Sequence, residues 1–328
     1  MIAPFSFLNH TDSEHAPKLV AVGMNASCYS EDFGITWTTG SITSGHWRCV
    51  RRGGGIYLAV GINVAAISTD GKSFESIAIP SGDWSECIYM ENIDRWLVVR
   101  GQRLGTSGSS NSNQYLTSDD NGATWISRTL PRSGRTLSAT YGAGQTVVAQ
   151  NANTSGNNIF RTTDGENWNG QSFWPAKQAV KIRYFEPIQG ATSGCFGISF
   201  FAGAGRMGIT SDDTSWSWSI LPDIGVDSGE IPVGFTTPLG RVARYIPQND
   251  ANYILFSDDD GSNAIVIGQS STWRDGVYIN NSESSIRHVI VSSDGAKRIG
   301  TLGQTGSAFT MRGGPEQDAM QLYGVCYG

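Results

Sequence analysis

The residues whose types and spacing could do chemistry are first of all the aspartates, because seven of them return in one short phrase. One full copy reads Ser30-Glu31-Asp32-Phe33-Gly34-Ile35-Thr36-Trp37, and a second runs from Ser118 to Trp125. Repeated carboxylates in loops can bind calcium or transfer protons, so this set is the first candidate for an active site. The central aspartates are Asp32, Asp70, Asp120, Asp164, Asp212, Asp259 and Asp294.

Turn chemistry offers a structural explanation for the same aspartates. An Asp that opens a tight turn accepts hydrogen bonds from backbone N–H groups ahead of it, a Gly permits positive φ, and the closing aromatic buries its ring. Eleven of the nineteen Asp residues lie in these phrases, so most of the aspartates are assigned to the scaffold. Asp258-Asp259-Asp260 lacks EF-hand spacing and is interpreted as a turn; we expect no metal and no cofactor. The closing aromatics are Trp37, Phe74, Trp125, Trp168 and Trp216.

The spacing of the phrases predicts the fold. Successive central aspartates are separated by 38, 50, 44, 48, 47 and 35 residues, close to the period of a four-stranded propeller blade. Short β-branched and aromatic runs bounded by Gly, Asn and Ser read as strands. We therefore predict an all-β, seven-bladed β-propeller of four-stranded antiparallel blades, with residues 1–328 as one domain. Residues 18–23 and 320–327 both read as strands, so one blade is expected to combine the two ends of the chain.

The segment from Trp47 to Phe74 shows the strands of one blade. Residues 47–50 are predicted as its inner strand, 51–55 as a Gly-rich turn, and 56–60 and 64–68 as the next two strands. The Asp phrase then leads into an outer strand.

The phrase S-x-D-x-G-x-T-W resembles the Asp-box, or BNR repeat, of sialidase-type propellers. The resemblance runs through essentially the whole chain, with two complete copies, three shortened copies and two degraded ones. It implies that each Asp-box is the turn between the third and fourth strands of a blade, so that all seven lie on the face opposite the ligand. Families with this repeat include hydrolases, sorting receptors, photosystem assembly factors and viral tail proteins, so the resemblance predicts a fold rather than an activity.

Candidate binding residues therefore lie in the links between blades. These links and the turns between second and third strands lie on the same face, which we call the link face. Tryptophan beside Arg or Asp could stack on a sugar or anchor a protein partner, or could fill the gap between blades. The long polar turns at 101–113, 150–158 and 279–285 share this face. The candidates are Trp47, Arg48, Asp83, Trp84, Arg132, Arg135, Trp174, Asp227, Glu230, Trp273 and Arg274.

The obvious enzyme hypothesis is a sialidase-like hydrolase, and its implied site is not found. The resemblance would require an Arg triad that begins with an F/Y-R-I-P phrase near the N-terminus, yet no Arg precedes Arg48. We assign no catalytic residue. A hydrolase of neutral glycans needs only two opposed carboxylates and stays open as an alternative. Its candidate carboxylates are Asp83, Glu86, Asp223, Asp227, Glu230 and Asp275.

Composition narrows the class of partner. A net charge of −6 disfavours nucleic acid, and no apolar run is long enough to predict a membrane span. Five cysteines without a CxxC pair predict reduced thiols, and the first residues do not read as a signal peptide. With 18 Arg, 5 Lys and Ser/Thr/Asn/Gly-rich loops, the chain is similar in character to a phage virion component, such as a tail, fibre or capsid-decorating protein.

The leading hypothesis is therefore a non-catalytic recognition or structural module, made in the host cytoplasm and carried in the virion. Its expected partners are other virion proteins or a host-surface glycan. Two alternatives remain: a glycoside hydrolase on the same fold, and an intracellular assembly factor that docks a protein on Arg48, Arg51 and Arg52.

Overall fold

The computed structural model describes four long segments of the chain and a set of strands beyond them. The segments are residues 19–101, 113–132, 135–151 and 157–172. The further strands lie within 178–220, 244–268, 273–312 and 322–327, with gaps between them. Every regular element described is a strand, which confirms the all-β prediction.

Pairing groups these strands into antiparallel sheets, six with four strands and one with three. The first combines β27 (Leu322–Tyr327), β1 (Leu19–Gly23), β2 (Ala26–Ser30) and β3 (Thr38–Thr39). The second holds β4 (Trp47–Gly53), β5 (Ile56–Gly61), β6 (Val64–Ser68) and β7 (Glu75–Ile77). The third holds β8 (Trp84–Met90), β9 (Arg95–Arg100), β10 (Gln114–Ser118) and β11 (Ile126–Thr129).

The remaining sheets follow in chain order. The fourth holds β12 (Arg135–Gly142), β13 (Gln145–Asn151), β14 (Asn157–Thr162) and β15 (Asn169–Ser172). The fifth holds β16 (Gln178–Phe185), β17 (Cys195–Phe201), β18 (Arg206–Thr210) and β19 (Ser217–Ile220). A three-stranded sheet follows, with β20 (Arg244–Tyr245), β21 (Tyr253–Ser257) and β22 (Ala264–Gly268). The last holds β23 (Trp273–Tyr278), β24 (Ile286–Ser292), β25 (Ile299–Gly303) and β26 (Phe309–Arg312).

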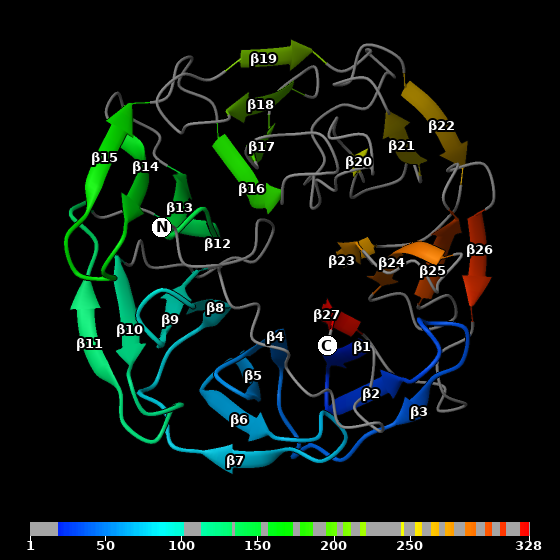
Figure 1. Cartoon of the computed structure of the whole chain (residues 1–328), viewed down its shortest axis with the longest axis horizontal. Coiled ribbons are helices and arrows are strands. Elements are labelled where there is room, and N and C mark those ends of the chain that lie inside the picture. The colour runs from blue at the N-terminus through cyan, green and yellow to red at the C-terminus, as the bar shows by residue number, and fades with distance from the viewer. Residues whose placement is uncertain are drawn as a thin grey trace, which may run out of the picture.

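The sheets stand around a common centre (Figure 1). In each sheet the strand named first above lies innermost, and the strand named last lies at the rim. Neighbouring inner strands contact one another in the order β23, β27, β4, β8, β12 and β16. β27 lies innermost in its sheet and pairs antiparallel with β1, from Leu19 opposite Tyr327 to Gly23 opposite Leu322. Strands from the two ends of the described chain thus share one sheet.

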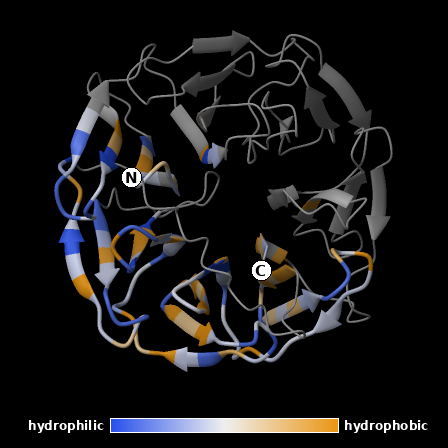
Figure 2. Ribbon diagram, in the orientation of Figure 1, coloured by the Kyte–Doolittle hydropathy of each residue, from blue (hydrophilic) through white to orange (hydrophobic). Residues whose placement is uncertain are grey.

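Apolar side chains fill the sheets and the spaces between them. All residues of β1 and β5 are buried, and both strands are strongly hydrophobic (Figure 2). One core cluster joins Val60 on β5 to Trp84 on β8 and Leu116 on β10, so it spans the second and third sheets. Similar clusters join the first sheet to the second and the third to the fourth, so in this part of the ring neighbouring sheets bury their faces against each other.

One detail of the predicted blade is corrected. Arg51, Arg52 and Gly53 belong to β4, because they pair with Leu58, Tyr57 and Ile56 in the ladder, so the predicted turn at 51–55 shrinks to Gly54 and Gly55.

Candidate functional site

The Asp turns use their carboxylates to hold the backbone. In the first, Asp32 accepts hydrogen bonds from the backbone N–H of Thr36 at 2.8 Å and from its Oγ1 at 2.6 Å. Ser30 Oγ donates to Asp32 Oδ1 at 2.8 Å and accepts from Gly34 N at 2.7 Å. The turns with Asp70, Asp120 and Asp164 repeat this pattern of a Ser or Thr hydroxyl and a bonded carboxylate. The described copies therefore act as turn formers, each between the third and fourth strands of its sheet.

The closing aromatics pack against their sheets. Trp37 is buried and donates from Nε1 to Gly34 O at 3.2 Å. Trp168 donates to the hydroxyl of Tyr115 at 2.9 Å, with their rings edge-on at 5.4 Å. Trp125 is partly exposed, and its indole N–H has no hydrogen-bond partner among the described residues. Asp212, Trp216, Asp259 and Asp294 lie outside the described residues.

These turns should make the fold sensitive to acid. Burial alone would raise the pKa of Asp164, but hydrogen bonds from Asn167, Glu166 and Thr162 outweigh it and hold the pKa well below the ordinary value of 3.8. The pKa values of Asp32, Asp70 and Asp120 are lowered as well. Since the unfolded chain then binds protons at higher pH than the folded one, the stabilisation is complete above about pH 5 and is lost as the pH falls through 3.8 towards the folded-state pKa.

Asp164→Asn should lower the free energy of unfolding by about 1 kcal/mol at pH 7, because the amide keeps one acceptor oxygen but loses the charge. The same variant should lose less stability than the parent between pH 5 and pH 3. Urea unfolding at both pH values measures this. Glu91 is an exposed carboxylate outside the Asp turns, so Glu91→Gln is the control. It should change neither the free energy of unfolding at pH 7 nor its loss between pH 5 and pH 3. An identical acid slope in parent and Asp164→Asn would contradict the assignment.

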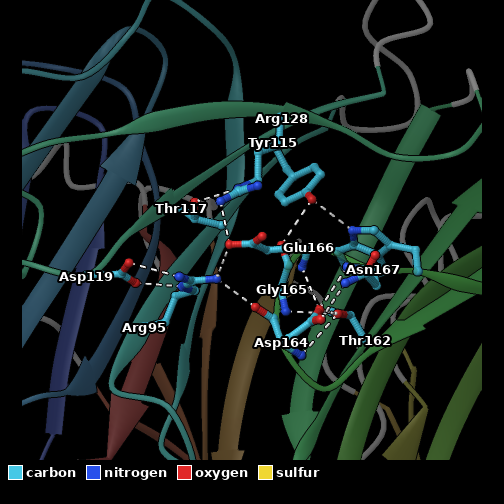
Figure 3. A network of polar contacts seen from close by, with 11 residues as sticks. Arg95, Tyr115, Thr117, Asp119, Arg128, Thr162, Asp164, Gly165, Glu166 and Asn167 are labelled. Atoms are coloured by element: carbon cyan, nitrogen blue, oxygen red, sulfur yellow. Dashed lines mark hydrogen bonds and ion pairs between the residues drawn. The ribbon is translucent and has the colours of Figure 1, made fainter.

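A network of charges on the Asp-turn face joins the third and fourth sheets (Figure 3). Arg95 binds Asp119 through two contacts, Nε to Oδ1 at 2.6 Å and Nη2 to Oδ2 at 2.9 Å. Its Nη1 reaches across to the next sheet and donates to Asp164 O at 2.7 Å and to Glu166 Oε1 at 2.8 Å. Arg128 donates to the same Glu166 oxygen at 2.6 Å. The hydrogen bond from Arg95 is the main cause of the lowered pKa of Asp119.

A double-mutant cycle with Arg95→Gln and Glu166→Gln should give a coupling of roughly 0.5–1 kcal/mol in the free energy of unfolding. The carboxylates are exposed, which limits the gain, but the planar guanidinium bridges two sheets. The pair Lys72 and Glu31 joins the first two sheets by one exposed contact of 2.6 Å and serves as the control. We expect a smaller coupling there; equal values in the two cycles would count against the network.

The link face of the first three sheets is held by a repeated backbone clasp. Asn25, at the tip of the turn from β1 to β2, donates from its backbone N to Gly45 O at 2.8 Å and accepts from Gly45 N on Oδ1 at 2.9 Å. Asn63, in the turn from β5 to β6, makes the same two bonds with Gly82, both at 2.8 Å. Both asparagines have positive φ, near 55°, which Asn tolerates better than most residues.

This clasp was missed from the sequence, although a signal for it exists. The pairs Gly23-x-Asn25 with Ser44-Gly45-x-Trp47, and Gly61-x-Asn63 with Ser81-Gly82-x-Trp84, repeat the same residues at nearly the same spacing. Only the paired phrases, taken together, indicate a contact between neighbouring sheets.

Trp47 and Trp84 close this clasp from inside, which corrects their prediction as ligand-binding residues. Trp47 is 0% exposed and Trp84 1%. Their indole N–H groups are used internally, by Thr43 O at 3.0 Å and Pro80 O at 2.8 Å. A ring that has no exposed surface and no spare donor cannot stack on a ligand. The packing alternative is the correct one for these two residues.

Arg48 and Asp83 come from two neighbouring links of the link face, and the structure brings their side chains together. Arg48 Nη2 donates to Asp83 Oδ2 at 3.2 Å, while Nε lies 2.9 Å from Oδ1 without its N–H pointing at that oxygen. Burial raises the pKa of Asp83, and the charges of Arg48 and Arg100 oppose that rise. This pair belongs to the predicted binding set and keeps both charge and partial exposure.

A second cluster lies on the inner strands and was not predicted. Glu86 on β8 is buried, and its carboxylate lies 3.4 Å from Arg51 Nη2 on β4 and 3.6 Å from Arg183 Nη1 on β16. Arg51 Nη1 also donates to Val325 O on β27 at 3.0 Å. Three arginines proposed as a docking cluster are therefore engaged, since Arg48 pairs with Asp83, Arg51 with Glu86, and Arg52 lies over the Tyr57 ring at 5.6 Å.

The other predicted binding residues are placed only in part. Arg132 is partly buried just before β12. Arg135, Trp273 and Arg274 lie in β12 and β23, where the structure describes the backbone and not their side chains. Trp174, Asp227 and Glu230 lie outside the described residues. Within the described residues, no cluster of His, Cys, Asp and Glu could hold a metal ion, and no helix is long and apolar enough to cross a membrane.

Comparison with known proteins places the fold. No protein-family model matches this sequence, and no curated protein matches it. Among solved structures, YCF48 bound to a D1 peptide aligns with 83% of this chain and 84% of its own, at 16% identity and a TM-score of 0.59. YCF48 from Cyanidioschyzon merolae aligns with 84% of this chain and 89% of its own, at 15% identity and a TM-score of 0.60.

An enzyme is among the similar structures too. An ancestral GH74 enzyme aligns with 90% of this chain and 44% of its own, at 12% identity and a TM-score of 0.63. These identities are low enough that the likeness concerns architecture alone. The ring of four-stranded antiparallel sheets and these similarities together show that this chain has a β-propeller fold.

Proposed function

We propose that this chain is a seven-bladed Asp-box propeller that binds a protein partner without catalysis. The observation that carries the proposal is the state of the two predicted link-face carboxylates that the structure describes. Asp83 is paired with Arg48, and Glu86 lies between Arg51 and Arg183. Glycoside hydrolysis needs one carboxyl group to act as acid and another as base or nucleophile. Carboxylates committed to arginine are suited to holding a surface in shape.

The link face has the properties of a surface that binds a protein. Clasps through Asn25 and Asn63 hold the loops on a rigid frame, and rigid loops lose little entropy when a partner docks. Short polar side chains are exposed around the partly buried Arg48–Asp83 pair, and Met24 adds apolar area with 38% of its surface exposed. One structure with a similar fold, YCF48, holds a peptide of D1, which supports the choice of a protein partner.

For the setting we propose a phage virion, with other virion proteins as partners. Support comes from the Arg-rich, Lys-poor composition and the Ser/Thr/Asn/Gly-rich loops. Flanking genes for tail or capsid proteins, and recovery of this chain from purified particles, are the expected findings. Cellular genes on both sides, with no chain in particles, would move the protein to the assembly-factor alternative.

Binding and catalysis can be tested on one preparation of the full chain. A glycan array and a reducing-sugar release assay should both be negative, while cross-linking in particles should join the link face to a neighbouring protein. Ser44→Arg, on the link face, should reduce that cross-linking about tenfold, a change of ~1.4 kcal/mol in affinity. Ala123→Arg, exposed in an Asp turn on the opposite face, is the matched control and should leave it unchanged.

Each other outcome has a clear meaning. Glycan binding without turnover would replace the protein partner by a host glycan. Turnover that disappears in Asp227→Asn or Glu230→Gln would establish the hydrolase alternative. Equal loss of cross-linking in both arginine variants would show that the link face is not the docking face.

A further inference from the structure

Two buried thiols face each other across neighbouring inner strands. Cys49 on β4 and Cys87 on β8 are 1% and 0% exposed, and their sulfur atoms lie 3.6 Å apart. The backbone N–H of Cys87 donates to Cys49 Sγ at 3.5 Å, so the two strands are close as well as the side chains. Both cysteines are free thiols in this structure.

The groups around the pair give the two sulfurs different characters. Cys49 Sγ donates to Glu86 Oε2 at 3.5 Å, and Arg51 Nη2 lies 3.4 Å from that same oxygen. Burial would raise the pKa of Cys49, but the hydrogen bond from Cys87 and the charge of Arg51 outweigh it and lower the pKa. Burial raises the pKa of Cys87 far above its ordinary value. The environment therefore favours ionisation more at Cys49 than at Cys87, so Cys49 is the sulfur that we expect to react first with an oxidant.

We propose that Cys49 and Cys87 form an oxidisable pair that closes to a disulfide between two neighbouring sheets when a small peroxide reaches them. A disulfide needs an S–S distance near 2.05 Å, so the sulfurs must approach by about 1.5 Å. The sulfurs are already in contact at 3.6 Å, and Cys87 N lies 3.5 Å from Cys49 Sγ, so the two side chains start side by side.

The reaction balances with a peroxide as the only oxidant. The sulfur of Cys49 attacks one oxygen of hydrogen peroxide, the O–O bond breaks, and the thiol proton passes to the departing oxygen, which yields a sulfenic acid and one water. The thiol of Cys87 then displaces the sulfenic oxygen as a second water, and the S–S bond forms. Overall the two thiols lose two electrons and two protons, and the peroxide becomes two molecules of water.

The disulfide would tie β4 to β8 at the inner strands, where each sheet approaches the centre. It would close a loop of about 38 residues, which restricts the unfolded chain, so oxidation should raise the Tm by roughly 5–10 °C. Reduction with dithiothreitol should reverse the shift. The pair would then be a redox-dependent staple between two sheets of the ring.

The test uses the full chain, reduced and then treated with a small excess of hydrogen peroxide. Remaining thiols are alkylated in denaturant, and peptides are mapped by mass spectrometry while the Tm is followed by calorimetry. A linked peptide that joins Cys49 to Cys87, with the reversible rise in Tm, is the expected result. Cys28→Ser, in a different core cluster, should keep the linked peptide and the rise in Tm. Cys49→Ser and Cys87→Ser should lose the linked peptide and the rise in Tm.

Three results would overturn the proposal. Cys49 and Cys87 could be recovered as free thiols, either could be recovered as a sulfinic acid without a linked peptide, or the link could form with no rise in Tm. If a serine variant at 49 or 87 fails to fold, the peptide map of the parent and of Cys28→Ser still gives the answer. The map identifies the linked sulfurs directly.

Discussion

Deletion of residues 321–328 should abolish cooperative folding of the ring, or lower its Tm by at least about 15 °C. This segment contains β27, the innermost strand of the first sheet. Leu322, Val325 and Cys326 are buried, and the strand supplies the ladder partner of β1. Burial of three such side chains is worth about 5 kcal/mol, before any loss of backbone hydrogen bonds. Since a domain is stable by only ~5–15 kcal/mol, the loss approaches the whole stability.

The effect should spread because β27 also contacts its neighbours in the ring. It lies beside β23 and β4, and its Val325 carbonyl accepts from Arg51 at 3.0 Å. Deletion of Gly328 alone leaves β27 intact and is the control. Calorimetry and near-ultraviolet circular dichroism on both deletions measure the result. A truncated chain that melts within a few degrees of the parent would show that β27 does not close the ring.

Trp84→Ala should lower the free energy of unfolding by about 3–5 kcal/mol, the usual cost of truncating a fully buried tryptophan. Its ring packs with Cys49 and Val60 of the second sheet and with Trp96 of the third, so the cavity would open between two sheets. Loss of the indole N–H would also leave Pro80 O without the hydrogen-bond donor that lies 2.8 Å away in the parent. Urea unfolding of the full chain measures the loss.

Trp125→Ala provides the matched control for Trp84. This ring is partly exposed and its N–H has no partner among the described residues, so truncation should cost clearly less. Trp84→Phe should recover part of the loss, because it refills much of the cavity without the hydrogen bond. A cost at Trp84 no larger than that at Trp125 would restore Trp84 as a candidate for ligand binding.

The Asp turns could be predicted because their physics is local. Asp32 and Thr36, or Asp164 and Asn167, are only a few residues apart, so residue order alone brings donor and acceptor together.

The roles of the link residues could not be obtained in this way. In a sequence, Trp beside Arg is equally consistent with a ring that stacks on a ligand and with a ring that packs in the core. Only the packing of the neighbouring sheet excludes ligand stacking for Trp47 and Trp84. Arg48 and Asp83 are 35 residues apart, and Arg51 and Glu86 are as far apart, so their pairing depends on how adjacent sheets are set side by side. Cys49 and Cys87 depend on the same contact.

The amino-acid sequence by itself determined the repeated Asp turns, the all-β class and the four-stranded antiparallel sheets. Hydrogen bonds over three or four residues and strand-length apolar runs carry that information. The tertiary structure decided which carboxylates are paired, which tryptophans are buried and which thiols meet. Those properties arise between neighbouring sheets, where side chains from distant parts of the chain share one desolvated space and each changes the charge and solvent exposure of the others.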